Sequence, residues 1–382
     1  MARTAYPALS IAHLNRATLA RQLLLEPSRL DPVAAAEQIG GLQAQEPASP
    51  YLGLWTRLRS FDAADLDEAF RARRMVKASL MRATLHAVSL DDYLHLLPAI
   101  QPMLRGRSRR ETAGSPKRER IERLAEAAIA FSAQPRTNVE LREYMATLAD
   151  GDIDLPWWWV RLHAPFIHVP AETAWSFGRR PALIAAQSWA ADRRFATREA
   201  GTEHLVRRYL GAFGPAAITD MSTWSGLGMA GLRAAVAAVD ADGDLMRFSD
   251  ESGRELIDLA AAPRPDGDVP APPRLLPMWD SLVLGHRDRT RFLTDDHRAI
   301  VIARNGDTLP TFLVDGRVAG LWWAEPDGAT ATRIVLEPFG MLARAARLAL
   351  EEEAQRLAEF VGPREPAVYR RYRTTRARRS AG

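Results

Sequence analysis

Two glutamines separated by a single residue, Gln43 and Gln45, have a spacing that could aim two polar groups the same way. They follow Gly40-Gly41, which ends a predicted helix, and residues 42–45 are predicted to be extended. In an extended chain, residues i and i+2 share one side, so both amides would face that side while Ala44 turns inward. An amide is neither acidic nor basic near neutral pH and cannot act as a general base. This pattern alone predicts two glutamines that satisfy backbone groups near a helix end.

Motifs of the common enzyme classes are missing from the sequence. It contains no Walker phosphate loop, no HExxH, no GxSxG elbow and no dinucleotide-binding glycine fingerprint. The absence of cysteine excludes disulfides, thiol catalysis, iron–sulfur clusters and thiolate zinc sites. His163 and His168 flank a predicted helix-to-strand break and are expected to be structural or surface residues, with metal ligands as the alternative. We therefore expect no metal and no organic cofactor, and the pattern favours binding over catalysis.

Composition indicates a globular protein of several packed units. A chain of 382 residues allows two to four domains at roughly 100 to 200 residues each. No apolar run approaches the ~20 residues of a membrane span, and the first residues lack the features of a secretory signal. The formal net charge is +4, and Lys77 and Lys117 are the only lysines. Arginine, the main cation, suits bidentate contacts with phosphate. We expect a cytoplasmic protein.

The predicted elements of residues 1–112 have the order of a winged helix. Helices are followed by strands at 76–81 and 84–88, joined by a tight connection at Arg82-Ala83. A further helix begins after Ser89, a good N-cap residue. Helices followed by such a β-hairpin are typical of this motif.

The same order of elements returns twice, which indicates internal repetition. The weaker second copy, residues 113–198, has predicted helices at 139–148 and 156–163, a strand at 166–169 and a wing near 175–180. The third copy, residues 199–260, has predicted helices at 202–212, 218–225 and 230–239, and strands at 245–248 and 255–258.

A Pro-rich linker at residues 261–273 separates the repeats from a different pattern. In residues 274–382, apolar residues recur at every second position, as in a β-strand. Strands are predicted at 299–303, 311–314, 317–322 and 332–336. A helix at 340–360 and a basic tail at 369–379 follow; the tail is either a solvated terminus or a phosphate-binding arm. The predicted fold class is α+β: three tandem winged-helix modules, then a small antiparallel β-barrel or sheet with a C-terminal helix.

Winged helices favour nucleic acid as a partner, because a recognition helix can enter the major groove while the wing touches the backbone. A protein-interaction module is the alternative. Basic clusters recur near equivalent positions of the repeats and could line a channel with positive charge. They are Arg71, Arg73 and Arg74, then Arg105, Arg107, Arg109 and Arg110, and finally Arg179 and Arg180 at the second wing.

The sequence resembles the bacterial tandem winged-helix DNA glycosylases, the AlkZ- and YcaQ-like family, over nearly the whole chain. Short strings in the order and spacing of that family carry the resemblance. They are Gly41-Leu-Gln-Ala-Gln45, Met81-Arg-Ala-Thr-Leu-His86, Tyr209-Leu-Gly-Ala-Phe-Gly-Pro215, Trp224-Ser-Gly-Leu227, Leu276-Pro-Met-Trp-Asp280, Leu284-Gly-His-Arg-Asp-Arg289 and Val314-Asp-Gly-Arg-Val318. The resemblance implies a C-shaped protein whose channel holds damaged duplex DNA, with Gln43 and Gln45 as the catalytic residues.

The resemblance also suggests how amides could suffice. A purine alkylated on a ring nitrogen is already cationic and leaves readily, so the reaction needs a positioned water in a preorganised polar site. We expect the two carbonyl oxygens to hold that water while the NH2 groups bond elsewhere. Glycosylases that also nick the backbone use an amine, and Lys77 is the only lysine near the predicted site, so a monofunctional enzyme is expected.

Further residues are predicted to contact DNA: Arg82, Thr84 and His86 on the first wing, and His286, Arg287 and Arg289 near a hairpin that the resemblance suggests probes the duplex. Ala83 stands where the family motif has glycine, and Asp280 is expected to be a structural hydrogen-bond acceptor. The predicted partner is double-stranded DNA with alkylated purines, bound at the nucleoid by a monomer without an obligatory protein partner. The alternatives are a noncatalytic winged-helix regulator, which usually dimerises on a palindrome, and an interaction scaffold without salt-dependent DNA affinity.

Overall fold

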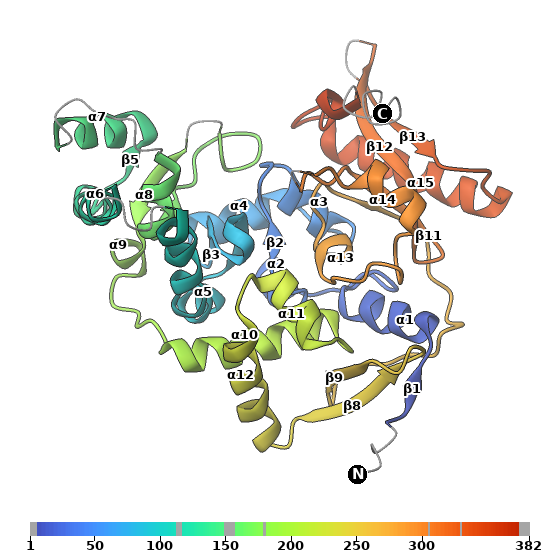
Figure 1. Cartoon of the computed structure of the whole chain (residues 1–382). Coiled ribbons are helices and arrows are strands. Elements are labelled where there is room, and N and C mark those ends of the chain that lie inside the picture. The colour runs from blue at the N-terminus through green and yellow to red at the C-terminus, as the bar shows by residue number, and fades with distance from the viewer. Residues whose placement is uncertain are drawn as a thin grey trace.

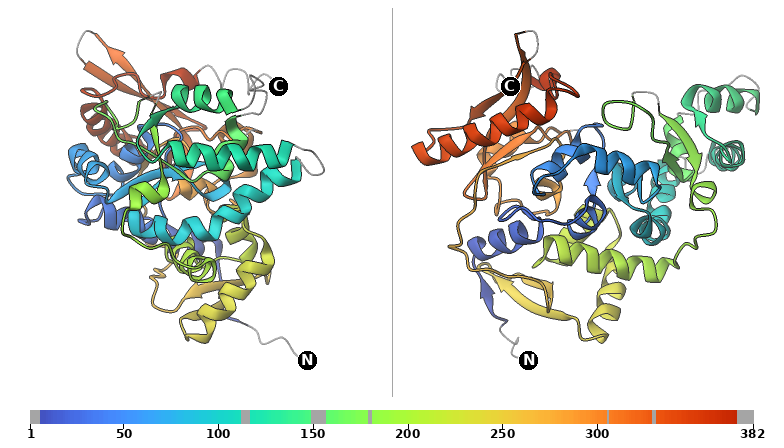
Figure 2. Two further views of the ribbon diagram at one scale, coloured as in Figure 1. Left: turned by 90° about the vertical axis from the view of Figure 1, so that its left-hand side faces the viewer. Right: turned by 180° about the vertical axis from the view of Figure 1, so that it is seen from behind.

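The computed structural model contains three modules with one order of elements, followed by an antiparallel sheet and a long helix (Figures 1 and 2). The structure describes residues 6–111, 117–148, 157–178, 181–304, 306–328 and 331–373. In Figure 1 the second module lies at the upper left, the C-terminal part at the upper right, the first module between them and the third module below. Among the described helices, none is long and apolar enough to cross a membrane.

The first module begins with a capped helix and ends in the predicted first wing. The Asp31 carboxylate accepts hydrogen bonds from two backbone N–H groups of α2, and Pro32 takes the first helical position. Gly40 and Gly41 have φ angles of +76° and +89°, which other residues rarely adopt, and they turn the chain into β2. The elements are α2 (Pro32–Gln38), β2 (Leu42–Gln43), α3 (Ser49–Trp55), α4 (Ala63–Arg71), β3 (Met75–Ser79), η1 (Met81–Ala83) and β4 (Leu85–Ser89).

A long helix, α5 (Leu90–Glu111), connects the first module to the second. Pro98 inside α5 has no N–H to donate to the Leu94 carbonyl, and the Ala196 N–H donates to it instead, at 3.0 Å. The segment before the third module is thereby attached to α5. The second module has a hydrophobic core of its own. Its elements are α6 (Lys117–Phe131), β5 (Arg136–Thr137), α7 (Asn138–Leu148), α8 (Trp157–His163), β6 (Phe166–His168), β7 (Ala182–Ala185) and α9 (Ala186–Ala190).

The third module repeats the order, with a β-bridge between Ala216 and Ile257 in place of the short strand. Gly226, at φ +82°, ends its second helix. The elements are α10 (Arg198–Phe213), α11 (Ile218–Ser225), α12 (Met229–Ala241), β8 (Leu245–Asp250) and β9 (Glu255–Leu259). The prediction of three tandem winged-helix modules is confirmed.

All three modules share one strand order, in which the second hairpin strand lies between the short strand and the first hairpin strand. The orders are β2-β4-β3, β5-β7-β6 and, with the Ala216 bridge as the short strand, Ala216-β9-β8. Strands β3 and β6 pair with each other, so the sheets of the first two modules merge into one six-stranded sheet. Strand β1 (Ala8–Leu9) covers the corresponding edge of the third module by pairing with β8. This pairing protects edges that would otherwise expose unpaired backbone groups.

The C-terminal part is an antiparallel sheet of order β10-β11-β12-β13 with α15 packed against it. The strands do not close into a barrel. Of the predicted alternatives, a barrel or an open sheet, the protein therefore has the open sheet. Asp315 and Gly316, with φ of +45° and +73°, form the predicted turn between β11 and β12. The elements are β10 (Arg274–Leu276), α13 (Ser281–Leu284), α14 (Asp295–Val301), β11 (Thr311–Val314), β12 (Arg317–Asp327), β13 (Ala331–Pro338), α15 (Arg344–Val361) and η2 (Arg370–Tyr372).

Two predicted strand regions are wrong. Residues 299–301 of the predicted strand 299–303 belong to α14, which begins with two aspartates, where the helix dipole favours negative charge. A short apolar run fits a strand and a buried helix equally well. Residues 175–178 of the predicted second wing form a loop instead. Trp175 and Phe177 of this loop are buried in the core shared by the first module and the C-terminal part.

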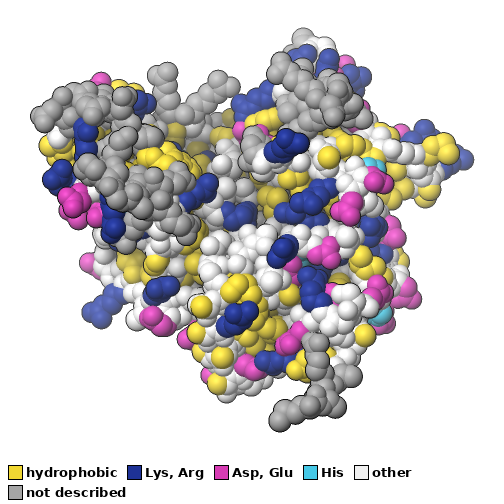
Figure 3. All heavy atoms as spheres, in the orientation of Figure 1, with side chains coloured by type: hydrophobic (Ala, Val, Ile, Leu, Met, Phe, Trp, Pro, Cys, Tyr) yellow, Lys and Arg dark blue, Asp and Glu magenta, His cyan; other side chains and the backbone are white. Residues whose placement is uncertain are grey.

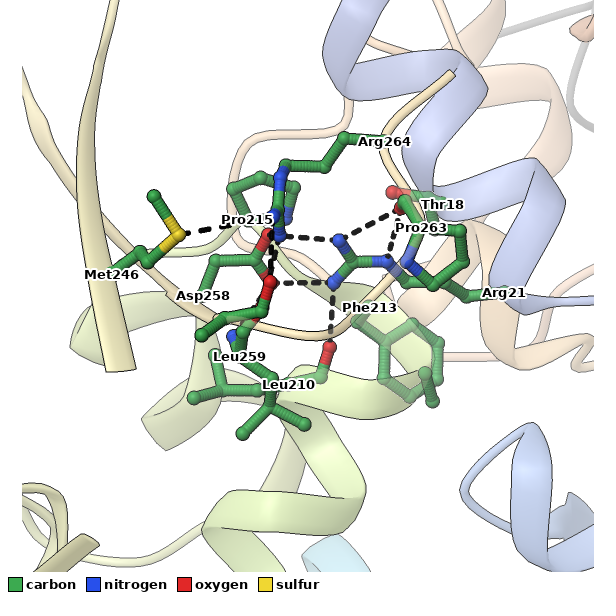
Figure 4. Close-up of polar contacts among 12 residues, drawn as sticks. Thr18, Arg21, Leu210, Phe213, Pro215, Met246, Asp258, Leu259, Pro263 and Arg264 are labelled. Carbon is green, nitrogen blue, oxygen red and sulfur yellow. Dashed lines mark hydrogen bonds and ion pairs between the residues drawn. The ribbon is translucent and has the colours of Figure 1, made fainter. Parts of the chain in front are cut away.

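Helix α1 (Ile11–Arg21) packs against the third module although it precedes the first in sequence. Its last residue, Arg21, is fully buried and holds both carboxylate oxygens of Asp258 on β9, at 2.6 and 2.8 Å (Figure 4). Arg264 of the Pro-rich linker donates to the same carboxylate at 2.7 Å. Arg21 also donates to the backbone carbonyls of Leu210 and Pro263. These bonds, which we call the Arg21–Asp258 cluster, join α1, the third module and the linker.

Candidate active site

The two glutamines lie at the end of β2, an edge strand of the six-stranded sheet. Gln43 is paired with His86 of β4 in the sheet register. Beyond β2, the Ala44 N–H donates to the Leu85 carbonyl, and Gln45 Oε1 accepts from the Leu85 N–H, both at 2.8 Å. Ala44 is fully buried, as expected, but Gln43 is only 6% exposed whereas Gln45 is exposed. The two amides therefore lie close in sequence with unequal access to solvent.

Arg82 holds the side chain of Gln43. Its Nη2 donates to Gln43 Oε1 at 3.0 Å, and its Nη1 donates to the carbonyl of Trp224 near the end of α11. The φ angles of Arg82 and Ala83 are +56° and +64°, in the left-handed region that favours glycine and costs other residues roughly 1 kcal/mol each. The turn between β3 and β4 adopts this conformation although neither residue is glycine. Arg82 thus connects β2 of the first module to the third module.

A second cation lies near Arg82. Burial, together with the positive charge of Arg289, lowers the pKa of Arg82 to about 10, so Arg82 stays charged at neutral pH. Arg289 is half-buried, and its Nε donates to the Val283 carbonyl at 3.0 Å. On the face in Figure 3, Lys and Arg side chains (dark blue) lie across the middle of the molecule, over the region where Figure 1 places β2 and α13. Neighbouring cations of this kind favour a bound phosphate, which would relieve their repulsion.

The hydrogen bonds of the amides differ from those expected. Each carbonyl oxygen already accepts one protein donor, from Arg82 for Gln43 and from Leu85 for Gln45. Neither NH2 group donates to any residue that the structure describes. A carbonyl oxygen has two lone pairs and an NH2 group has two protons, so each amide offers one acceptor and two donor positions. The NH2 groups therefore do not bond elsewhere in the described protein, while one lone pair of each oxygen stays open to the expected water.

His86, the register partner of Gln43 on β4, is 1% exposed, so the prediction that it contacts DNA is wrong. Its Nδ1 lies 3.0 Å from the Thr84 carbonyl, so Nδ1 is the protonated nitrogen and Nε2 is an acceptor. Nε2 is buried and finds no donor among the described residues. Burial, with the charge of Arg82, lowers the pKa of His86 to about 3. Thr84 is half-buried and its hydroxyl donates to the Met81 carbonyl, within the turn.

The second predicted group of DNA contacts follows α13 in a loop, where the sequence predicted a hairpin. His286 is 1% exposed and its Nε2 lies 2.9 Å from the Phe213 carbonyl, so the prediction that it contacts DNA is wrong for this conformation as well. Burial holds the pKa of His286 well below its usual range. Arg287 is exposed; its backbone N–H donates to Asp220 Oδ1 at 3.0 Å, and its guanidinium bonds to no residue among those described. Arg179 and Arg180 lie outside the described residues.

Comparison with known proteins decides the family. The family model described as "DNA glycosylase AlkZ-like" matches residues 36–360. The chain belongs to the AlkZ-like DNA glycosylase family. An "Interstrand DNA cross-link repair glycosylase" from Streptomyces sahachiroi is 28% identical over 165 residues, in an alignment that covers 41% of this chain and 42% of that protein. The solved structure of Streptomyces sahachiroi DNA glycosylase AlkZ has a TM-score of 0.76 at 21% identity, over 93% of this chain and 97% of that one. Family and fold therefore agree with the resemblance seen in the sequence.

Asp280, in one of the AlkZ-like strings, is a structural acceptor as predicted. It accepts both Nη groups of Arg57, at 2.8 and 2.9 Å, and caps α13 through the Leu282 N–H. Arg57 and Asp280 are almost fully buried. Within the described part of the chain, no group of three acidic or histidine side chains is placed to hold a metal ion.

Two groups near Gln43 and Gln45 were not predicted from the sequence. The Trp224 carbonyl holds Arg82, and Glu46, next to Gln45, accepts a hydrogen bond from Tyr372 Oη at 2.8 Å. The motif Trp224-Ser-Gly-Leu227 contributed to the family resemblance but did not predict this contact, because a residue of any type has a backbone carbonyl. Tyr372 lies within a tail whose composition indicated a solvated terminus or a phosphate-binding arm.

Proposed function

We propose that this protein is a monofunctional DNA glycosylase that hydrolyses the N-glycosidic bond of alkylated purines, in DNA repair or in self-resistance to an alkylating agent. Gln43 and Gln45 lie at the reacting bond, and the preferred lesions are N7-alkylguanine and bulkier adducts, interstrand crosslinks among them. The observation that carries the proposal is the Arg82–Gln43 bond, which brings β2, the first wing and the end of α11 to one point. The name of the Streptomyces relative supports the crosslink substrate.

The remaining hydrogen-bond positions of the amides fit such a reaction. When the bond between C1′ and N9 breaks, its electron pair goes to N9, which neutralises the cationic alkylpurine. Water then adds to C1′ of the oxocarbenium-like sugar and loses a proton to solvent. The free lone pair and NH2 protons of Gln43 and Gln45 orient this water or the departing base. Since amides supply no proton transfer, cleavage is confined to bonds weakened by alkylation.

Charged groups near Gln43 supply the affinity for DNA. Arg82 uses two of its N–H groups within the protein and keeps others for a phosphate. Arg289 lies close enough to lower the pKa of Arg82, and Arg287 is exposed on the same loop. We retain Arg82, Thr84, Arg287 and Arg289, with Arg179 and Arg180 on sequence grounds, as proposed DNA contacts of a monomer that acts on duplex DNA at the nucleoid.

The placement of Lys77 supports base release without strand cleavage. Lys77 is 4% exposed, and its Nζ lies 4.8 Å from the centre of the Phe177 ring. Burial lowers its pKa to about 8. An amine that opens an abasic site must reach the sugar aldehyde. Because Lys77 is enclosed, the product is expected to be an abasic site in an uncut strand.

Base release from a duplex oligonucleotide with a single N7-methylguanine tests the proposal. The unaltered protein is expected to release the base well above the spontaneous rate and to leave the strand uncut. Gln43→Ala and Gln45→Ala are expected to lose this activity while retaining duplex binding. Gln355→Ala, at an exposed glutamine of α15, is the matched control and is expected to stay fully active. A noncatalytic regulator would instead bind the duplex tightly and release no base above background. This result would have to hold for a bulky adduct and a crosslink as well.

A further inference from the structure

Glu46, the residue after Gln45, is held by the end of the described chain. Its carboxylate accepts a hydrogen bond from Tyr372 Oη at 2.8 Å and forms an ion pair with Arg371. The side chain of Glu46 is 19% exposed, so these bonds are partly shielded from water. Positions 46 and 372 are 326 residues apart, which makes this a tertiary contact set by the fold.

A second contact fixes the other end of the same loop. Tyr369 Oη lies 2.8 Å from the Ser49 hydroxyl, and Tyr369 is 4% exposed. Ser49 begins α3, and its N–H donates to the Glu46 carbonyl at 3.1 Å. Residues 45–49 are thus bound at Glu46 and at Ser49, by side chains that lie within one turn of each other.

The segment that makes these contacts is itself attached to the C-terminal sheet. The Ala324 N–H of β12 donates to the Val368 carbonyl at 3.0 Å, and Arg373 pairs with Glu325 of the same strand at 2.8 Å. The Tyr372 ring also packs edge-on against Trp279, with centroids 6.4 Å apart. Residues 369–372, which we call the anchor segment, therefore join the loop that carries Gln45 to β12.

We propose that Tyr369, Arg371 and Tyr372 are positioning residues for the reaction, because they hold the Gln45 loop in the geometry that the chemical step needs. This inference rests on the proposed function of Gln43 and Gln45. Gln45 is fixed by one side-chain hydrogen bond, to Leu85, and loops without further contacts move. A misplacement of about 1 Å can cost on the order of 100-fold in rate. The anchor segment opposes such a displacement because it binds Glu46 and Ser49, the residues that follow Gln45 in the loop.

Kinetics on the duplex with N7-methylguanine distinguish positioning from proton transfer by Glu46. Tyr372→Phe and Glu46→Ala each remove a hydrogen bond to a charged group and are expected to lower the single-turnover rate about tenfold, with the duplex Kd unchanged. The double variant is expected to be no slower than Glu46→Ala, because Glu46→Ala already removes the bond that Tyr372→Phe removes. Glu46→Gln keeps an acceptor for Tyr372 and is expected to regain most of the rate. Arg347→Ala, which removes an exposed ion pair with Glu351 within α15, is the matched control.

Hydrogen exchange gives a readout that does not depend on activity. Backbone amides of residues 44–49 are expected to exchange faster in Tyr372→Phe than in the unaltered protein, and to be unchanged in Arg347→Ala. Equal exchange and equal rates in Tyr372→Phe and the unaltered protein would overturn the proposal. So would a Glu46→Gln variant as slow as Glu46→Ala, since Glu46 would then act as a base, or variants that lose their fold. Absence of base release by the unaltered protein would count against the proposed function, while hydrogen exchange would still test the anchor segment.

Discussion

The Arg21–Asp258 cluster and the Arg82–Gln43 contact each join parts of the chain that are far apart in sequence, but they differ in how completely their polar groups are satisfied. Arg21 is fully buried and bonded to a carboxylate and two carbonyls. Asp258 receives a second arginine, Arg264, and a backbone N–H. Arg82, in contrast, is half-buried and has a second cation, Arg289, as a neighbour.

This difference separates a structural network from a site that is built to bind something. A closed network such as the Arg21–Asp258 cluster leaves no group for a ligand, and losing Arg21 leaves the buried Asp258 carboxylate with Arg264 as its remaining cationic partner. Around Gln43, the amide protons have no acceptor among the described residues and stay available to a ligand, and the buried His86 Nε2 lacks a donor there. A buried group without a partner, such as His86 Nε2, lowers stability, and such groups are typical of functional sites.

The largest expected effect is on stability, from Arg21→Ala. It leaves the Asp258 carboxylate buried with one fewer partner and should lower the free energy of unfolding by roughly 3–5 kcal/mol. Arg59→Ala is the matched control, since Arg59 pairs with Glu26 at the surface and should contribute less than about 1 kcal/mol. Urea unfolding measures both, and equal losses would show that the buried cluster contributes no more to stability than a surface ion pair.

The next effect is on activity, from Arg82→Met. It frees the Gln43 carbonyl and is expected to slow base release about 100-fold through misplacement of the amide. Its cost in stability should be well below that of Arg21→Ala. Arg82→Lys keeps the charge but lacks the planar fork that reaches both Gln43 and Trp224, so it should be nearly as slow. Full activity of Arg82→Lys would show that the charge alone matters.

A smaller effect is expected from pH, through His86. Its pKa of about 3 in the folded protein lies below the ordinary 6.5, so the unfolded chain binds the proton first as pH falls. Stability from this group is therefore complete above pH 6.5 and declines below it, by about 1.4 kcal/mol per pH unit until the folded pKa is reached. Urea unfolding at pH 7.5 and 5.5 should show His86→Gln losing about 1.4 kcal/mol less than the unaltered protein. Identical losses would show that His86 does not titrate in this way.

The smallest effect is expected from Arg287→Ala, at an exposed arginine near the site. Removal of one phosphate contact should reduce the slope of log affinity against log salt by about one, with little change in stability. Titration of a duplex at several salt concentrations measures this slope. Arg347→Ala on α15 is the control, and a slope that falls equally in both variants would show that Arg287 contributes only general charge.

Local patterns predicted most of the elements and the family of this protein. Turn and cap residues fixed helix ends at Asp31 and Gly40, and the order of elements indicated the three modules. The same patterns failed at residues 299–303, where a short apolar run has no period that separates strand from helix. They also failed for His86 and His286, because histidine is common both at DNA interfaces and inside proteins, and burial is not encoded in residue type.

The sequence by itself determined the repeated winged-helix order, the closing sheet and helix, and the Gln43–Ala44–Gln45 string, because these depend on residue types at short separations. The tertiary structure alone decided which groups meet at the site. Arg82 reaches Trp224 across 142 positions, and Tyr372 reaches Glu46 across 326. Such contacts follow from packing of β2, α11 and the C-terminal sheet against one another, and no local period or motif carries that information.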